Sequence, residues 1–234
     1  MIIFRDPKKK STYELKIKID GKKLFPSRFV KYLGIFIDDH LNWHANESAI
    51  STKLSRATGM LYKIRHFVKQ ETLRMIYYGI FSSILMYGSH IWGQNKNIVD
   101  KLQILQNKAL RAITFESSRA SAPPLFKRCQ ILMLVDNIKL QNFMFIHDSL
   151  NNNLPSSLSN KVTLVSTVHY TRNEDYEQLD IPTTRTITYG SNNITSRSVH
   201  SWNDISRLMP NIKFRHESKA FCKKMVTKFM YDSY

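Results

Sequence analysis

The hydrophobic pattern of the chain changes its period near residue 45. Before that point, apolar and polar positions alternate from Tyr13 to Ile19, which is typical of a half-buried strand. Asp20-Gly21 follows, a sequence typical of a two-residue hairpin turn, and a second extended run covers residues 29–37. The first 38 residues therefore predict a small antiparallel β-hairpin unit. It has few apolar residues of its own, so we expect it to pack against another part of the protein.

From about residue 46, apolar residues recur every three or four positions, the period of an amphipathic helix. One apolar stripe runs from Ile50 to Val68. Further helices are predicted over residues 71–87, 98–113, 132–150, 198–208 and 217–230, and Pro123-Pro124 interrupts the chain before the third of these. Residues 156–195, between the helices predicted over 132–150 and 198–208, are rich in Ser, Thr and Asn. They predict irregular structure with short strands near 162–165 and 186–189.

The predicted fold class is α+β, mainly α: a small N-terminal antiparallel β-hairpin unit, then a helical bundle and a mixed C-terminal region. We divide the chain into five parts. They are a β-unit at 1–44, a helical domain at 45–116, a helical extension at 117–155, an irregular or short-strand segment at 156–195, and a C-terminal helical segment at 196–234.

Composition makes this a folded, strongly basic protein. The 234 residues include 35 Lys plus Arg against 18 Asp plus Glu, a net charge of +17, and 42% are apolar, too many for a disordered basic tail. The charge is +7 over 1–35, +2 over 36–76, +5 over 77–130, −2 over 131–190 and +5 over 191–234. Cys129 and Cys222 form no C-x-x-C pair, which indicates neither a disulfide scaffold nor a zinc module and favours an intracellular setting. A polyanionic partner is the resulting hypothesis.

Three features could indicate a membrane span, a catalytic site or a metal site, and each has a simpler interpretation. The uncharged stretch Met75–Asn95 is 21 residues long, enough for a membrane span, but its Tyr, Ser and Gly residues favour a buried helix followed by a turn at Gly88. Phe36-Ile37-Asp38-Asp39 matches the F-x-D-D pattern of magnesium-binding polymerases. No returning apolar strand follows it, so we interpret the aspartates as the end of a strand that caps the next segment. His40 and His44 lack the Glu of a metalloprotease motif, and we predict no metal site and no catalytic residue.

Aromatic and basic residues alternate in Tyr62–Phe67 and Lys213–His216, as they do in grooves that follow a nucleic-acid backbone. An amphipathic helix with a core stripe would produce much of the same pattern. Both interpretations remain open from the residues alone.

Several motifs occur together in a familiar order. Lys31-Tyr32-Leu33-Gly34-Ile35-Phe36-Ile37-Asp38 is followed by Leu41-Asn42-Trp43, then by Leu85-Met86-Tyr87-Gly88, Ile91-Trp92-Gly93, the run from Leu102 to Arg111, Ala122-Pro123-Pro124-Leu125-Phe126 and Ser201-Trp202-Asn203. This series resembles the region of non-LTR (LINE-type) retrotransposon reverse transcriptases that starts at the end of the palm and continues through the helical thumb and beyond it. The resemblance covers nearly the whole chain.

The resemblance implies a role for each part. Residues 1–44 would be a remnant of the palm strands, and 45–116 a thumb-like domain. The family's catalytic F/Y-A-D-D turn lies upstream of the K-Y-L-G strand, so Asp38 and Asp39 do not inherit its role. We expect no cofactor in this chain, with magnesium held elsewhere in the parent enzyme, and we expect the chain to be inactive as a polymerase by itself. The implied partners are an RNA or RNA–DNA template–primer duplex, bound through its phosphates, and the upstream palm and fingers, with no membrane.

Face and charge select the candidate nucleic-acid-binding residues, which are Lys53, Arg56, Lys63, Arg65, Lys69, Lys101, Lys108 and Arg111. An alternative function is a host-recruited, non-enzymatic nucleic-acid-binding or interaction module. A membrane-associated protein using Met75–Asn95 is a second alternative. We expect an intracellular protein, in the nucleus, the cytoplasm or both.

Overall fold

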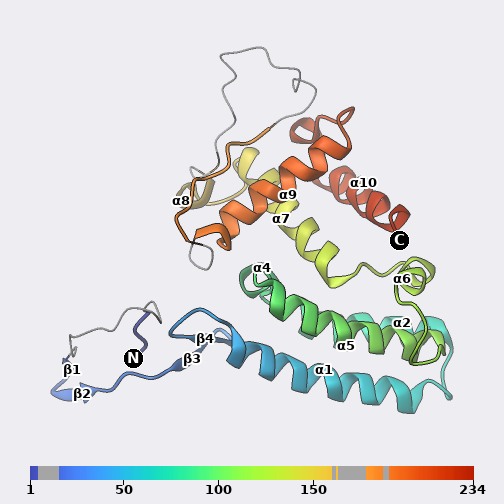
Figure 1. Cartoon of the computed structure of the whole chain (residues 1–234), viewed down its shortest axis with the longest axis horizontal. Coiled ribbons are helices and arrows are strands. Elements are labelled where there is room, and N and C mark those ends of the chain that lie inside the picture. The colour runs from blue at the N-terminus through green and yellow to red at the C-terminus, as the bar shows by residue number, and fades with distance from the viewer. Residues whose placement is uncertain (5–15, 160–161, 163–177, 187–189) are drawn as a thin grey trace.

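The computed structural model describes residues 1–4, 16–159, 162, 178–186 and 190–234. In these ranges, short paired strands occur at the N-terminal side and helices form the rest of the regular structure, so the predicted class, α+β and mainly α, is confirmed (Figure 1). The elements in chain order are β1 (Ile17–Ile19), β2 (Lys22–Leu24), β3 (Phe29–Tyr32), β4 (Ile35–Asp38), α1 (His44–Ile64), α2 (Gln70–Ile76), the π-helix η1 (Tyr77–Ser82), α3 (Ser83–Met86), α4 (Ser89–Trp92), α5 (Lys96–Thr114), α6 (Pro123–Cys129), α7 (Leu134–Leu150), α8 (Ser156–Ser159), α9 (Ile194–Leu208), the 3₁₀ helix η3 (Phe214–His216) and α10 (Lys219–Asp232).

The strands form two separate antiparallel hairpins. β1 pairs with β2 around Asp20-Gly21, whose φ angles of 47° and 74° fit a primed hairpin turn, as predicted. The single extended run predicted over 29–37 is wrong. β3 instead pairs with β4 around Leu33-Gly34, with φ angles of 46° and 84°. Apolar residues flank this second turn on both sides, which conceals it in the hydrophobic pattern.

The two hairpins differ in burial. Ile17 and Ile19 of β1 are 40% and 57% exposed, so the predicted half-buried strand is wrong over 17–19; residues 13–15 lie outside those described. The β3–β4 hairpin is docked. The Phe36 N–H donates to Asn46 Oδ1 on α1 at 3.2 Å, and the Tyr87 hydroxyl donates to the Leu33 carbonyl at 2.5 Å. Packing against other elements is therefore confirmed for the second hairpin.

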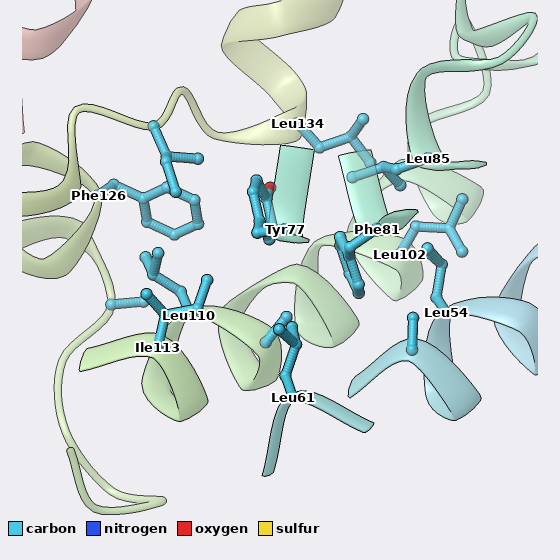
Figure 2. Packing of buried hydrophobic residues seen from close by; sticks show 14 of the residues in the cluster. Leu54, Leu61, Tyr77, Phe81, Leu85, Leu102, Leu110, Ile113, Phe126 and Leu134 are labelled. Carbon is cyan, nitrogen blue, oxygen red and sulfur yellow. The ribbon is translucent and has the colours of Figure 1, made fainter. Parts of the chain in front are cut away.

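The first hydrophobic core lies between α1, the α2–η1–α3 run and α5. The predicted stripe on α1 is confirmed, since Ile50, Leu54 and Leu61 are buried. Figure 2 shows Leu54 and Leu61 facing the ring of Phe81 and the side chain of Leu102, among other residues of the cluster. The helix predicted over 71–87 is present as α2, η1 and α3 in succession, and the predicted turn follows at Gly88 (φ 64°).

Among the described residues, no helix combines the length and the apolar character that crossing a membrane requires. The stretch from Met75 to Asn95 is distributed over the end of α2, η1, α3 and α4.

A second core joins α7 to the C-terminal helices. Phe143 stacks on Trp202 of α9, with ring centroids 4.7 Å apart, and meets Phe214 edge-on at 5.0 Å. In Figure 1, α7 leaves the layer of α1 and α5 and crosses α9. It contacts both α9 and α10. Pro123-Pro124, predicted only to interrupt the chain, stand in the first turn of α6, where the missing N–H groups of proline have no helical partner to lose. The strands predicted near 162–165 and 186–189 fall mainly outside the described residues.

Candidate nucleic-acid interface

One side of α1 carries three exposed cations. Arg56 and Lys63 are seven residues apart, two helical turns, and Lys53 precedes Arg56 by three, so the three share a side of the helix away from the buried stripe. We call this set the α1 basic face. Among the described residues, no carboxylate lies within ion-pairing distance of any of the three. Their charge is therefore available to an external anion.

Lys101 and Lys108 occupy a different position, on α5. They are also seven residues apart, and both are exposed. The Lys101 ammonium lies 3.5 Å from Oε2 of Glu47 on α1, which places this side of α5 along its contact with α1. Glu47 and Lys53 are six residues apart, about 120° around α1. The α5 lysines thus flank the α1 basic face rather than extend it.

Arg111 and Arg65 have contacts within the protein. Nε and Nη2 of Arg111 donate to the Ala120 carbonyl at 3.0 and 2.9 Å, which holds the segment after α5 against the helix. The Arg65 guanidinium lies 5.1 Å from the ring centroid of Tyr62 and 5.7 Å from that of Phe115. Lys69 is exposed just before α2. The structure thus gives Arg111 a structural role that charge counting did not predict, and a phosphate contact at this residue stays a prediction.

A groove of about 220 Å³ lies between the β3–β4 hairpin, α1 and α3. Phe36, Lys53 and Tyr87 are among the residues that line it. The Lys31 ammonium lies 5.7 Å from the centroid of the Phe36 ring. A cation of β3 is therefore close to one of the residues that line this groove. Lys31 was absent from the predicted set. Recognising the Leu33-Gly34 turn would have indicated it, because that turn folds β3 onto β4 beside α1.

The first aspartate of the F-x-D-D sequence organises the start of α1. The Asp38 carboxylate accepts the backbone N–H groups of His40 (3.2 Å), Asn42 (2.7 Å) and Trp43 (2.5 Å). Trp43, the residue before α1, has φ 64° and makes no side-chain cap of its own. The interpretation of these residues as a strand end that caps the next segment is confirmed. In the described part of the chain, no three or more His, Cys, Asp or Glu side chains are grouped so that they could hold a metal ion.

Buried titratable groups lie in the cores, away from the α1 basic face. Burial raises the pKa of Tyr77, whose hydroxyl accepts a hydrogen bond from Gln106 Nε2 at 2.9 Å. Burial also raises the pKa of Cys222 to about 11, and it lowers that of His90. These groups belong to the packing of the protein, while the α1 basic face consists of exposed lysine and arginine side chains.

Comparison with known proteins gives one relationship. No protein-family model matches the chain, and no solved structure does. A curated protein from Drosophila melanogaster, described as a probable RNA-directed DNA polymerase from transposon BS, is 31% identical over 102 residues. The match covers 42% of this chain and 11% of that protein, so the chain spans a small part of the length of this relative. Part of this chain is therefore similar to a transposon RNA-directed DNA polymerase, in agreement with the resemblance to reverse transcriptases.

Proposed function

We propose that this chain is the part of a non-LTR retrotransposon reverse transcriptase that holds the backbone of a template–primer duplex. The observation that carries the proposal is the α1 basic face, Lys53, Arg56 and Lys63, exposed on one side of a helix and without ion-pair partners among the described residues. The net charge of +17 and the similarity to a transposon polymerase support it. Residues 45–116 would then be the thumb, and 1–44 the last strands of the palm.

The mechanism available to this face is contact with phosphates. Lys and Arg side chains on a rigid helix replace the counterions of a duplex, and their release drives binding without base readout. Lys101 and Lys108 would contact phosphates further along the duplex, beside the α1–α5 contact. The proposal gives this chain no part in holding magnesium, because the Asp38 carboxylate is already occupied by three backbone N–H groups. We therefore expect no primer extension by this chain alone.

A salt series tests the proposal. In the variant Lys53→Ala/Arg56→Ala/Lys63→Ala, the plot of log affinity against log salt for an RNA–DNA hybrid is expected to lose about 2 to 3 units of slope, since each lost phosphate contact removes about 0.7 to 0.9. Fluorescence anisotropy with a labelled hybrid measures it. A matched control, Lys223→Ala/Lys224→Ala/Lys228→Ala, removes the same charge from exposed positions of α10 and should change the slope by less. Equal slopes for wild type and the α1 variant would overturn the proposal.

The exposed apolar side chains of the hairpins are assigned to a protein partner. Ile19, Phe25 and Leu33 are 57%, 70% and 72% exposed. In the parent polymerase, this surface would pack against the upstream palm and fingers. The same surface favours the second candidate, a host-recruited interaction module, in which another protein would cover it. Under both candidates, we expect this chain to bind a duplex by itself, in the absence of any polymerase partner.

A further inference from the structure

A cluster of one arginine and three ring-bearing side chains lies where α1 and α5 both end. We call Tyr62, Arg65, His66 and Phe115 the tip cluster. The Arg65 guanidinium lies between two rings, 5.1 Å from the centroid of Tyr62 and 5.7 Å from that of Phe115. Its Nε donates to His66 Nε2 at 3.2 Å, and the His66 ring meets Phe115 edge-on with centroids 6.2 Å apart. Residues fifty positions apart in sequence are thus assembled into one surface.

The backbone places these side chains outside the core. α1 ends at Ile64, and the Phe67 N–H donates to the Ile64 carbonyl at 2.9 Å in the turn that follows. α5 ends at Thr114, and the next residue, Phe115, has a left-handed φ of 59° while its N–H donates to the Arg111 carbonyl. Glycine is the usual residue at such a position, and a bulky side chain there is strained. An aromatic ring therefore stands at a position that backbone preference alone would give to glycine.

The rings are exposed rather than buried. Phe67 is 85% exposed and Phe115 is 48% exposed. Lys63 and Lys69 are exposed beside them in sequence, and the nearby Glu116 is paired with Arg128 at 3.2 Å. The surface around the tip cluster thus combines aromatic faces with a surplus of positive charge.

We infer that the tip cluster, with Phe67, is a stacking site for unpaired bases of a single-stranded nucleic acid. The inference rests on the proposed function and adds a substrate class to it: a single strand, bound at the C-terminal end of α1, next to Lys63 of the α1 basic face. Every base has a π-face that can stack on an exposed aromatic ring, and cations between the rings bind the connecting phosphates. The alternation of rings and cations favours this ligand over an apolar protein surface, which would leave the cations without anions.

The test compares three variants on three probes: Phe67→Ala/Phe115→Ala, the control Phe221→Ala and the α1 basic-face variant. The probes are a short oligothymidylate, an abasic oligomer of the same length and charge, and the RNA–DNA hybrid. Phe67→Ala/Phe115→Ala is expected to lower affinity for the oligothymidylate by about tenfold or more, as the loss of base–aromatic stacking does. Its affinity for the abasic oligomer and the hybrid should stay within about twofold of wild type. The control Phe221→Ala removes an exposed ring of α10 and should leave all three affinities unchanged.

The outcomes separate this inference from the proposed function. If the α1 basic-face variant weakens hybrid binding while Phe67→Ala/Phe115→Ala leaves oligothymidylate binding intact, the inference is wrong and the proposed function stands. If neither variant affects any probe, both are wrong. An equal loss on the oligothymidylate and the abasic oligomer would show that the rings do not act through the bases, and it would overturn stacking. Circular dichroism checks folding, and Phe67→Ala alone, in an exposed turn, provides the same test if the double variant is unfolded.

Discussion

A single carboxylate, that of Asp38, organises the passage from β4 into α1. The first N–H groups of a helix and of the turn before it have no partner in the helix itself, and they need acceptors from side chains or water. Asp38 accepts three such N–H groups, those of His40, Asn42 and Trp43. It thereby fixes the direction of α1, the helix that carries Lys53, Arg56 and Lys63.

Asp38→Ala is expected to lower the free energy of unfolding by about 1 to 2 kcal/mol, the range for loss of a helix-capping side chain. Asp38→Asn, which keeps one acceptor oxygen, should lose less. Urea denaturation followed by circular dichroism measures both. Asp39→Asn is the neighbouring comparison, since it leaves the three hydrogen bonds of the Asp38 carboxylate in place. An Asp38→Ala variant as stable as wild type would remove the carboxylate from the account of how α1 begins.

At the scale of elements, an added side chain is expected to have opposite effects on stability at two glycines. Gly59 lies in the middle of α1, and a Cβ added there would meet no atom within 4 Å. Gly88 lies between α3 and α4 at φ 64°, and a Cβ there would lie 2.4 Å from Cδ1 of Ile35 on β4. Gly59→Ala is therefore expected to raise the free energy of unfolding by about 0.5 to 1 kcal/mol. Gly88→Ala should lower it by about 1 to 2 kcal/mol through left-handed strain. Thermal unfolding of both variants measures the pair, and a change of the same sign in both would contradict it.

The periodic elements could be predicted from sequence, and the irregular ones could not. The helices predicted over 98–113 and 132–150 correspond to α5 and α7 within two residues at each end. α5 has one apolar face at helical spacing, and α7 is rich in apolar residues that are buried on more than one side. The Leu33-Gly34 turn escaped prediction because both strands that it joins are apolar. The exposure of Lys53, Arg56 and Lys63 also followed from helical spacing. The contact of Arg111 with the Ala120 carbonyl could not, since it depends on the path of a loop.

At the scale of the whole molecule, α7 connects two cores. Its first turns, with Leu134 and Ile138, belong to the core of α1 and α5, whereas Phe143 belongs to the core of α9 and α10. Tyrosines near the C-terminus reinforce the junction. The Tyr234 hydroxyl donates to Asp136 at 2.6 Å and accepts the Met133 N–H at 2.9 Å, and the Tyr231 hydroxyl donates to the Gln130 carbonyl at 2.7 Å. The C-terminal helices are thus held to the layer of α1 and α5, which carries the α1 basic face.

The partly buried Tyr231 and Tyr234, the buried Tyr77 and the buried Cys222 make the protein sensitive to alkali. Burial raises the pKa of Tyr231 from 10.0 to about 12 and that of Cys222 from 9.0 to about 11, and it raises those of Tyr77 and Tyr234 as well. Because each group keeps its proton longer in the folded state, the unfolded chain releases protons first as pH rises. Stability from these groups is complete below about pH 9, and it is lost as pH rises from there toward the folded-state values.

Urea denaturation over a pH series from about 8 to 11 measures this decline, which amounts to about 1.4 kcal/mol per pH unit for each proton released only by the unfolded chain. Tyr77→Phe should decline less steeply than wild type. Phenylalanine does not titrate, it keeps the ring that stacks on Phe81 at 5.2 Å, and it leaves Gln106 Nε2 bonded to the Leu132 carbonyl. Both proteins are compared at the same high salt concentration, where interactions between surface charges are screened. Parallel declines for wild type and Tyr77→Phe would contradict the assignment of part of this alkaline loss to Tyr77.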